Sequence, residues 1–508
     1  MVRDHTERAK RRVGNRAIAL IDHLLEPTED AEGSSSRASL VRELIVHNDK
    51  PRSGQGIFTE QDYTNEIQDV FSAIVRLLGK MATLWVLRWH SYDTPTREII
   101  DTLARKCPNL RETHISGPIK DFPWFQTVSV SSPPGLFSPI LHTLKSFRCS
   151  LPEGSIDILH HILENCKSLE ALGIAFAPTD SLNAITPRGK PWNLRLKSLE
   201  LATVGLLTGG ADATARFCGS FDLGGLESLR LDRCNDIPTL LEALSVTSGI
   251  ERLRHLSIWT LAGQNEMSQI TSFIGQLGQL HPTGGLESLE LADLGSKIDF
   301  EAVGRNKRLV VLRVTEWDAF ISPLIPNHTG ISSDQILGPT RGRLLNTRDI
   351  EMLGRNCEGI SELWVDVARR TKLDEAIISS FGSLPALKKL GLCFQPPWKP
   401  LESLGIREQK LLETEEDVMR LDQQAILRIA QLVHEHGATN LREIEVQYGC
   451  RSKPGEPPQR PCSTSDGGGR TVWRIQKKED DLQVGLFKAD PLVNRYGVPI
   501  SYVFEGWS

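Results

Sequence analysis

The chain has 508 residues, a formal net charge of -5 and 39% hydrophobic residues. This composition is typical of a folded soluble protein, excludes disorder throughout and gives no reason to expect a nucleic-acid partner. We find no apolar run of the ~18 residues that a membrane-spanning helix needs, and the mixed charge of Met1 to His5 is unlike a signal peptide. Nine cysteines without paired spacing indicate free thiols, and therefore a cytoplasmic or nuclear location without a membrane partner.

The first 39 residues predict an N-terminal helix followed by a loop. Arg3 to Leu25 has a helical pattern with a basic first half, and Glu29 to Ser36 is polar and loop-like. A basic first helix is usually a solvated face or a cap, so we interpret residues 1–39 as a cap on the structure that follows.

A leucine pattern recurs through residues 40–450. Its form is Leu-x-x-Leu-x-Leu, and the clearest copies begin at Leu196, Leu226, Leu253, Leu286, Leu309, Ile360, Leu387 and Leu441. Looser copies begin at Leu110, Leu144 and Leu169, with Val41 and Met81 as weaker candidates. From Phe147 to Leu312 the steps between copies are 23 to 33 residues, close to the ~20–29 residues of a leucine-rich repeat.

Each copy predicts a short strand whose last two apolar residues point inward, followed by a helix. One such unit cannot bury its apolar face alone, so neighbouring units stack. We therefore predict an α/β fold in the form of an open leucine-rich-repeat solenoid, or horseshoe, with parallel strands on the concave face and helices on the convex face. The main alternative is a closed barrel of eight strands and eight helices. At least eleven strand signals run from Leu110 to Val446, which is more than such a barrel holds.

Two stretches double the repeat spacing, and the chain changes character at its end. Proline and glycine predict insertions near residues 320–350 and 394–416, although the first stretch could also hold a degenerate repeat. A long helix follows the second insertion and ends at Gly437. Residues 451–470 predict a flexible linker. Residues 471–508 predict a C-terminal hairpin or tail, because 471–475 and 482–486 alternate around a charged run.

Cysteines accompany several copies of the repeat. Cys107, Cys166 and Cys357 end the helix before a strand, and Cys234 follows a strand. We expect them to be small buried residues between helix and strand. This pattern resembles the cysteine-containing leucine-rich repeats of F-box proteins, and the irregular repeats with a C-terminal tail resemble fungal F-box-like proteins. The resemblance implies a repeat domain that captures a substrate protein and a Skp-type adaptor of a cullin ubiquitin ligase as a further partner. Residues 1–39 hold no recognisable F-box, which in that family has three helices and opens with Leu-Pro.

No catalytic, phosphate-binding or metal-binding motif is present in the sequence, so we expect no enzyme, no cofactor and no metal. His160 with His161, and His434 with His436, have no third ligand in sight. The expected function is a non-catalytic protein-binding repeat scaffold. It would act either as the substrate-recognition part of an F-box-type ubiquitin ligase adaptor or as a scaffold with no ubiquitin-ligase link.

The ligand site is expected on the concave face of the later repeats. Residues before, between and after the inward positions should face outward there, and tryptophan with arginine dominates many protein interfaces. The candidate residues are Arg230, Asp232, Trp259, Arg313, Trp317, Trp364 and Asp366. Alternatively, the tryptophans pack under the insertion after Phe320 or against the C-terminal tail. The inward residues Leu229, Leu256, Leu289 and Leu363 should be almost fully buried.

Overall fold

A computed structural model describes much of the chain. The described residues are 18–26, 36–48, 60–91, 95–118, 138–150, 156–175, 185–187, 189–202, 210–232, 234, 236–246, 249–259, 264–280, 285–292, 298–315, 346–368, 374–395, 423–448, 469–478, 481–489, 492–493 and 499–500. The fold is α/β, with a large, mostly parallel sheet and helices packed beside it. The chain divides into two compact units, one reaching Gly225 and the other starting at Leu226.

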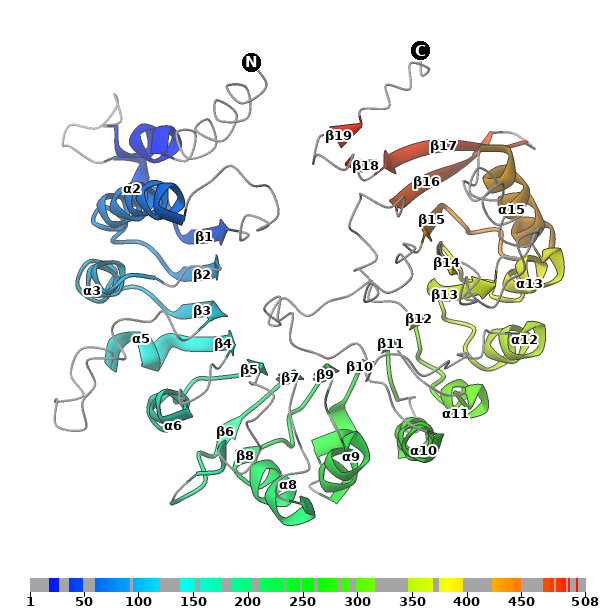
Figure 1. Ribbon diagram of the computed structural model, residues 1–508, viewed down its shortest axis with the longest axis horizontal. Coiled ribbons are helices and arrows are strands. Elements are labelled where there is room, and N and C mark those ends of the chain that lie inside the picture. The colour runs from blue at the N-terminus through cyan, green and yellow to red at the C-terminus, as the bar shows by residue number, and fades with distance from the viewer. Residues whose placement is uncertain are drawn as a thin grey trace, which may run out of the picture. The chain divides into compact units, whose positions relative to one another are not determined.

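The first unit alternates strands and helices. After a helical segment at 18–25 and the 3-10 turn η1 (Arg37–Leu40), its main sheet holds β1 (Glu43–Asn48), β2 (Val86–Ser91), β3 (Glu112–Pro118), β4 (Leu144–Ser150), β5 (Ala171–Ala175) and β7 (Ser198–Ala202). The helices are α2 (Glu60–Leu78), α3 (Arg97–Lys106), α5 (Ser138–Thr143), α6 (Ile156–Asn165) and α8 (Gly210–Cys218), and β6 (Leu194–Arg195) pairs with β8 (Phe221–Asp222). Figure 1 shows α2, α3, α5 and α6 on one side of β1 to β5.

The second unit repeats this plan. Its strands are β9 (Ser228–Asp232), β10 (His255–Trp259), β11 (Ser288–Ala292), β12 (Val311–Thr315), β13 (Glu362–Ala368), β14 (Lys389–Gln395) and β15 (Glu443–Tyr448). Its helices are α9 (Ile237–Val246), α10 (Gln264–Leu280), α11 (Phe300–Gly304), α12 (Thr347–Asn356), α13 (Glu375–Ser380) and α15 (Gln423–Glu435), with 3-10 turns η5 (Gly249–Arg252) and η7 (Phe381–Ser383). In Figure 1 the six α-helices lie on one side of β9 to β15.

The second unit ends in antiparallel strands. β16 (Gly469–Lys478) pairs antiparallel with β15 and with β17 (Asp481–Ala489), so a hairpin extends the parallel strands at the positions where the sequence alternates. A further short pair joins β18 (Leu492–Val493) to β19 (Pro499–Ile500). In neither unit does the last described strand pair with the first, so the described strands form no closed barrel.

The predicted inward leucines form continuous rows in the core. In the second unit, Leu229, Leu256, Leu289, Leu312, Leu363, Leu390 and Ile444 occupy matching positions on successive strands. Leu229, Leu289 and Leu363 are 0% exposed and Leu256 is 1% exposed, which confirms the predicted burial. Burying one such side chain contributes ~1.5–3 kcal/mol, and each strand adds a new member to the row.

Polar groups also join neighbouring repeats inside the second unit. The buried side chain of Asn306 donates to the carbonyl oxygen of Ile274 and accepts from the backbone N–H of Leu286. Gly285 has a φ of 52°, and a Cβ at that position would lie 2.3 Å from Oδ1 of Asn306. Glycine is therefore required both by the left-handed backbone and by the close approach of the amide.

One early copy differs in register from the leucine pattern, and one early strand carries a bulge. The copy expected at Met81 is displaced, because Leu84, Leu87 and Trp89 are the buried residues and the strand begins only at Val86. A bulge between Thr113 and His114 makes Ile115, rather than Thr113, the partner of Phe147. The Met81 copy therefore misplaces its inward positions by three residues, whereas the Leu110 copy places Thr113 and Ile115 correctly, because both are buried.

No described strand lies between the strands on either side of the two stretches of double spacing. β12 pairs directly with β13, and β14 pairs directly with β15. Residues 316–345 and 396–422, which include most of the two predicted insertions, lie outside the described residues, as does 451–468 of the predicted linker.

Candidate binding surface

The described helices of each unit lie on one face of its strands, and we call the opposite face the helix-free face (Figure 1). Side chains alternate along a strand, so residues between two inward leucines point to this face. In the second unit, Arg230, Ser257, Glu290, Arg313, Trp364, Gly391 and Glu445 form one row across seven strands. This row is the centre of the candidate binding surface.

The predicted site residues lie in neighbouring rows of this surface. Arg230, Arg313 and Trp364 belong to the central row, whereas Asp232 and Trp259 are paired on β9 and β10 in the next row. Asp366 lies in β13 with Cys393 of β14 as its partner in the register. Trp317 lies outside the described residues, so the structure brings together part of the predicted set.

The prediction that the tryptophans are exposed anchors is wrong for Trp259 and Trp364. Trp259 is 5% exposed and Trp364 is 3% exposed, and Asp232 is fully buried. Large aromatic rings gain free energy when they are removed from water, and in this protein the folded chain itself covers them. Trp259 and Trp364 therefore contribute to the stability of the strands before any partner binds.

The packing of Trp364 depends on the strand beside it. Gly391 is its neighbour in the register, and a Cβ at that position would lie 2.3 Å from two carbon atoms of the indole. A side chain larger than that of glycine at position 391 would therefore overlap the indole ring of Trp364. The charged groups of Arg313 and Lys389 lie 5.4 and 5.2 Å from the ring centre, within range of a cation–π interaction.

Charged side chains surround this tryptophan. Arg313 is 2.7 Å from Glu290 and 3.7 Å from Glu362, and Lys389 is 2.7 Å from Glu443 and 3.5 Å from the buried carboxylate of Glu445. Glu290, Lys389, Glu443 and Glu445 are not among the candidates predicted from the sequence. They occupy outward positions of the copies that begin at Leu286, Leu387 and Leu441, so the same spacing identifies them.

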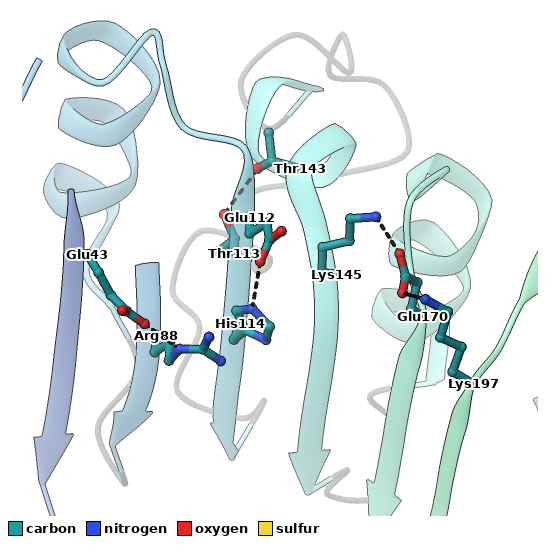
Figure 2. Close-up of polar contacts among 9 residues, drawn as sticks. All are labelled: Glu43, Arg88, Glu112, Thr113, His114, Thr143, Lys145, Glu170 and Lys197. Carbon is teal, nitrogen blue, oxygen red and sulfur yellow. Dashed lines mark hydrogen bonds and ion pairs between the residues drawn. The ribbon is translucent and has the colours of Figure 1, made fainter. Parts of the chain in front are cut away.

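The first unit also carries pairs of polar side chains along its strands. Figure 2 shows Glu43 beside Arg88, Glu112 beside His114, and Glu170 between two lysines. Arg88 donates to Glu43 at 2.7 Å, and the Glu112 carboxylate is 3.7 Å from the His114 ring. Burial and the neighbouring Arg88 lower the pKa of His114. This imidazole therefore resists protonation in the folded state.

Glu170 is held by charge on both sides. Its two oxygen atoms lie 2.5 Å from Lys145 and 2.6 Å from Lys197 (Figure 2). Hydrogen bonds from both lysines lower the pKa of Glu170 below its usual value, so the carboxylate stays charged. Thr113, which replaces a leucine in the copy that begins at Leu110, is fully buried, and its hydroxyl forms a hydrogen bond with that of Thr143 at 3.0 Å.

The three cysteines that precede strands are buried, as predicted from the sequence. Cys107 approaches the carbonyl oxygen of Leu78, and Cys357 approaches that of Asn306 at 3.4 Å. Burial raises the pKa of Cys107 to about 11 and the pKa of Cys166 and Cys357 to about 12. Thiols with such pKa values are poor nucleophiles, so these cysteines are suited to packing.

The described residues form neither a metal-binding cluster nor a membrane-spanning helix. No group of three or more His, Cys, Asp or Glu side chains among them could hold a metal ion. No helix in the same part of the chain is long and apolar enough to cross a bilayer.

Comparisons with known proteins do not assign the chain to a family. No family model matches the sequence, and no curated protein matches it. The class defined directly by the structure is therefore an α/β protein of parallel strand–helix units.

Proposed function

We propose that the chain is a non-catalytic leucine-rich-repeat solenoid that binds a protein on the helix-free face of its second unit. The observation that carries this proposal is the central row, in which seven strands in register bring their outward positions together. A row of this kind offers a wide and regular surface, which suits recognition of another folded chain or an extended segment.

The charges on this surface support a polar partner with complementary charge. Glu290, Glu362 and Glu443 are between 23% and 36% exposed, and Arg313 and Lys389 are 23% and 26% exposed. These ion pairs remain accessible to solvent, so charged side chains of a partner can form new ion pairs with the same residues. The buried rings of Trp259 and Trp364 keep the supporting strands rigid, which lowers the entropy lost on binding.

The leucine rows support the repeat class within the α/β architecture. Matching positions on successive parallel strands carry leucine or a similar apolar residue, as a leucine-rich repeat requires. Recruitment to a ubiquitin ligase rests on the resemblance of the cysteine positions alone. The six described free cysteines are all buried, which is compatible with the proposed cytoplasmic or nuclear location.

Comparative affinity purification with mass spectrometry tests the proposal. Arg230 faces the surface and is half-buried, so Arg230→Glu reverses one charge there without removing a core residue. The matched control is Arg355→Glu, which changes an exposed arginine on α12. We expect a set of proteins captured by the wild-type chain to be lost with Arg230→Glu and retained with Arg355→Glu. Equal capture by all three chains would contradict the proposed surface.

A further inference from the structure

A second surface lies at the start of the strands in the first unit. Arg42, Trp85 and Arg111 immediately precede β1, β2 and β3, and backbone hydrogen bonds hold them side by side. The N–H of Trp85 donates to the carbonyl of Arg42 at 2.8 Å, and the N–H of Arg111 donates to the carbonyl of Trp85 at 2.8 Å. The indole of Trp85 therefore has an arginine from each neighbouring strand.

Both arginines stack on this indole. The guanidinium carbon of Arg42 lies 4.3 Å from the ring centre, and that of Arg111 lies 4.7 Å from it. Stacking restricts each arginine side chain while leaving the N–H donors at its edge available. Trp85 itself is half-buried, whereas Arg42 and Arg111 are exposed.

The adjacent carboxylates lie beside other side chains. Glu43, next to Arg42, accepts a hydrogen bond from Arg88, and the carboxylate of Glu112, next to Arg111, lies 3.7 Å from the ring of His114 (Figure 2). Among the described residues, neither Arg42 nor Arg111 has a carboxylate partner. Within the described part of the chain, two oriented guanidinium groups are thus available to bind an anion.

The chemistry of the surface favours carboxylates of a protein segment. A guanidinium group binds a carboxylate through two parallel hydrogen bonds, so two arginines accommodate two acidic side chains. A nucleic acid fits poorly, because arginines occupy the indole on which a base would stack.

We propose that Arg42, Trp85 and Arg111 form a binding site for an acidic peptide segment of a partner protein. β1 and β3 are two strand spacings apart, roughly 10 Å, so the site spans a few residues of an extended peptide. The site lies in the first unit and shares no residue with the surface proposed for the second unit. Either proposal can therefore fail without the other.

Fluorescence anisotropy with the full chain and a labelled octaglutamate peptide tests this site. An octaglutamine peptide and an oligothymidylate of equal length are the comparison ligands. The octaglutamate should bind best although the chain carries a net charge of -5. The double variant Arg42→Gln with Arg111→Gln should weaken this binding by about tenfold, since each charge-assisted pair is lost.

The matched control is Arg97→Gln with Arg105→Gln, which removes two exposed arginines from α3 of the same unit. It should change the affinity by less than about twofold, since exposed charges away from the ligand act weakly. A third variant, Arg42→Lys with Arg111→Lys, retains both positive charges and should bind less tightly than the wild-type chain. The proposal is overturned if both glutamine variants lose the same affinity for octaglutamate, or if the lysine variant binds it as tightly as the wild-type chain. A preference for oligothymidylate over octaglutamate would also overturn it.

Discussion

Replacing Gly391 by alanine tests how the candidate binding surface is packed. The new Cβ would lie 2.3 Å from Cδ2 and Cε3 of Trp364 and 2.9 Å from its Cγ. Carbon atoms in contact normally stay about 3.5–4.0 Å apart, so the indole must move by more than 1 Å. The ring is 3% exposed and lies between Arg313 and Lys389, so this movement disturbs its neighbours.

Two opposing effects set the size of the change. Overpacking of a buried site costs about 1–3 kcal/mol, whereas alanine in place of glycine gains about 0.4–1 kcal/mol by restricting the unfolded chain. Gly391→Ala should therefore lower the free energy of unfolding by about 1–2 kcal/mol, measured by urea denaturation with circular dichroism. The matched control is Gly359→Ala, whose Cβ would make an ordinary contact at 3.5 Å and should cost nothing.

A double variant distinguishes this clash from a general effect on the strand. In a Trp364→Leu background the indole is absent, so the additional Gly391→Ala change should cost less than about 0.5 kcal/mol. If Gly391→Ala is as stable as Gly359→Ala, or if its cost is unchanged without the indole, the packing described for Trp364 is refuted.

Three further predictions concern the core, the pH dependence and the adaptor. Leu289→Ala should lower the free energy of unfolding by ~2–5 kcal/mol in urea denaturation, because it leaves a cavity in the leucine row. Since folding lowers the pKa of His114, the unfolded chain binds a proton more readily, and stability falls as the pH drops below about 6.5. His114→Asn should reduce that fall in denaturation midpoints measured between about pH 7.5 and pH 5, and an unchanged pH dependence would contradict this role. A purified Skp-type adaptor should not bind tightly in calorimetry, because the described helical segments before β1 are only 18–25 and η1; tight binding would contradict this expectation.

The later strands could be predicted from the sequence because their leucines report burial directly. In the copies that begin at Leu226, Leu253, Leu286 and Leu441, the first inward residue of the strand lies between polar residues, so the alternation of the strand is visible without a structure. The start of the chain is harder, since Trp89 and Thr113 replace leucine in the early rows. A tryptophan in a row, or a threonine satisfied by Thr143, carries no leucine signal.

The candidate surface could be located from the sequence, but its exposure could not. The leucine spacing places Arg230, Arg313 and Trp364 in one row, as the register shows. Whether Trp364 is exposed depends on the residue beside it on the next strand, which is Gly391. The spacing of one repeat gives no information about that contact, because it is made between two repeats.

Photo-crosslinking from defined positions tests the proposed binding surface most directly. A crosslinker at His255 lies exposed on β10 of the helix-free face, and one at Ser272 lies exposed on α10. With a partner protein obtained by the comparative purification, the proposal predicts crosslinks from position 255 and none from position 272. Crosslinks from position 272 alone would show that the partner binds the helices and would contradict the proposed function.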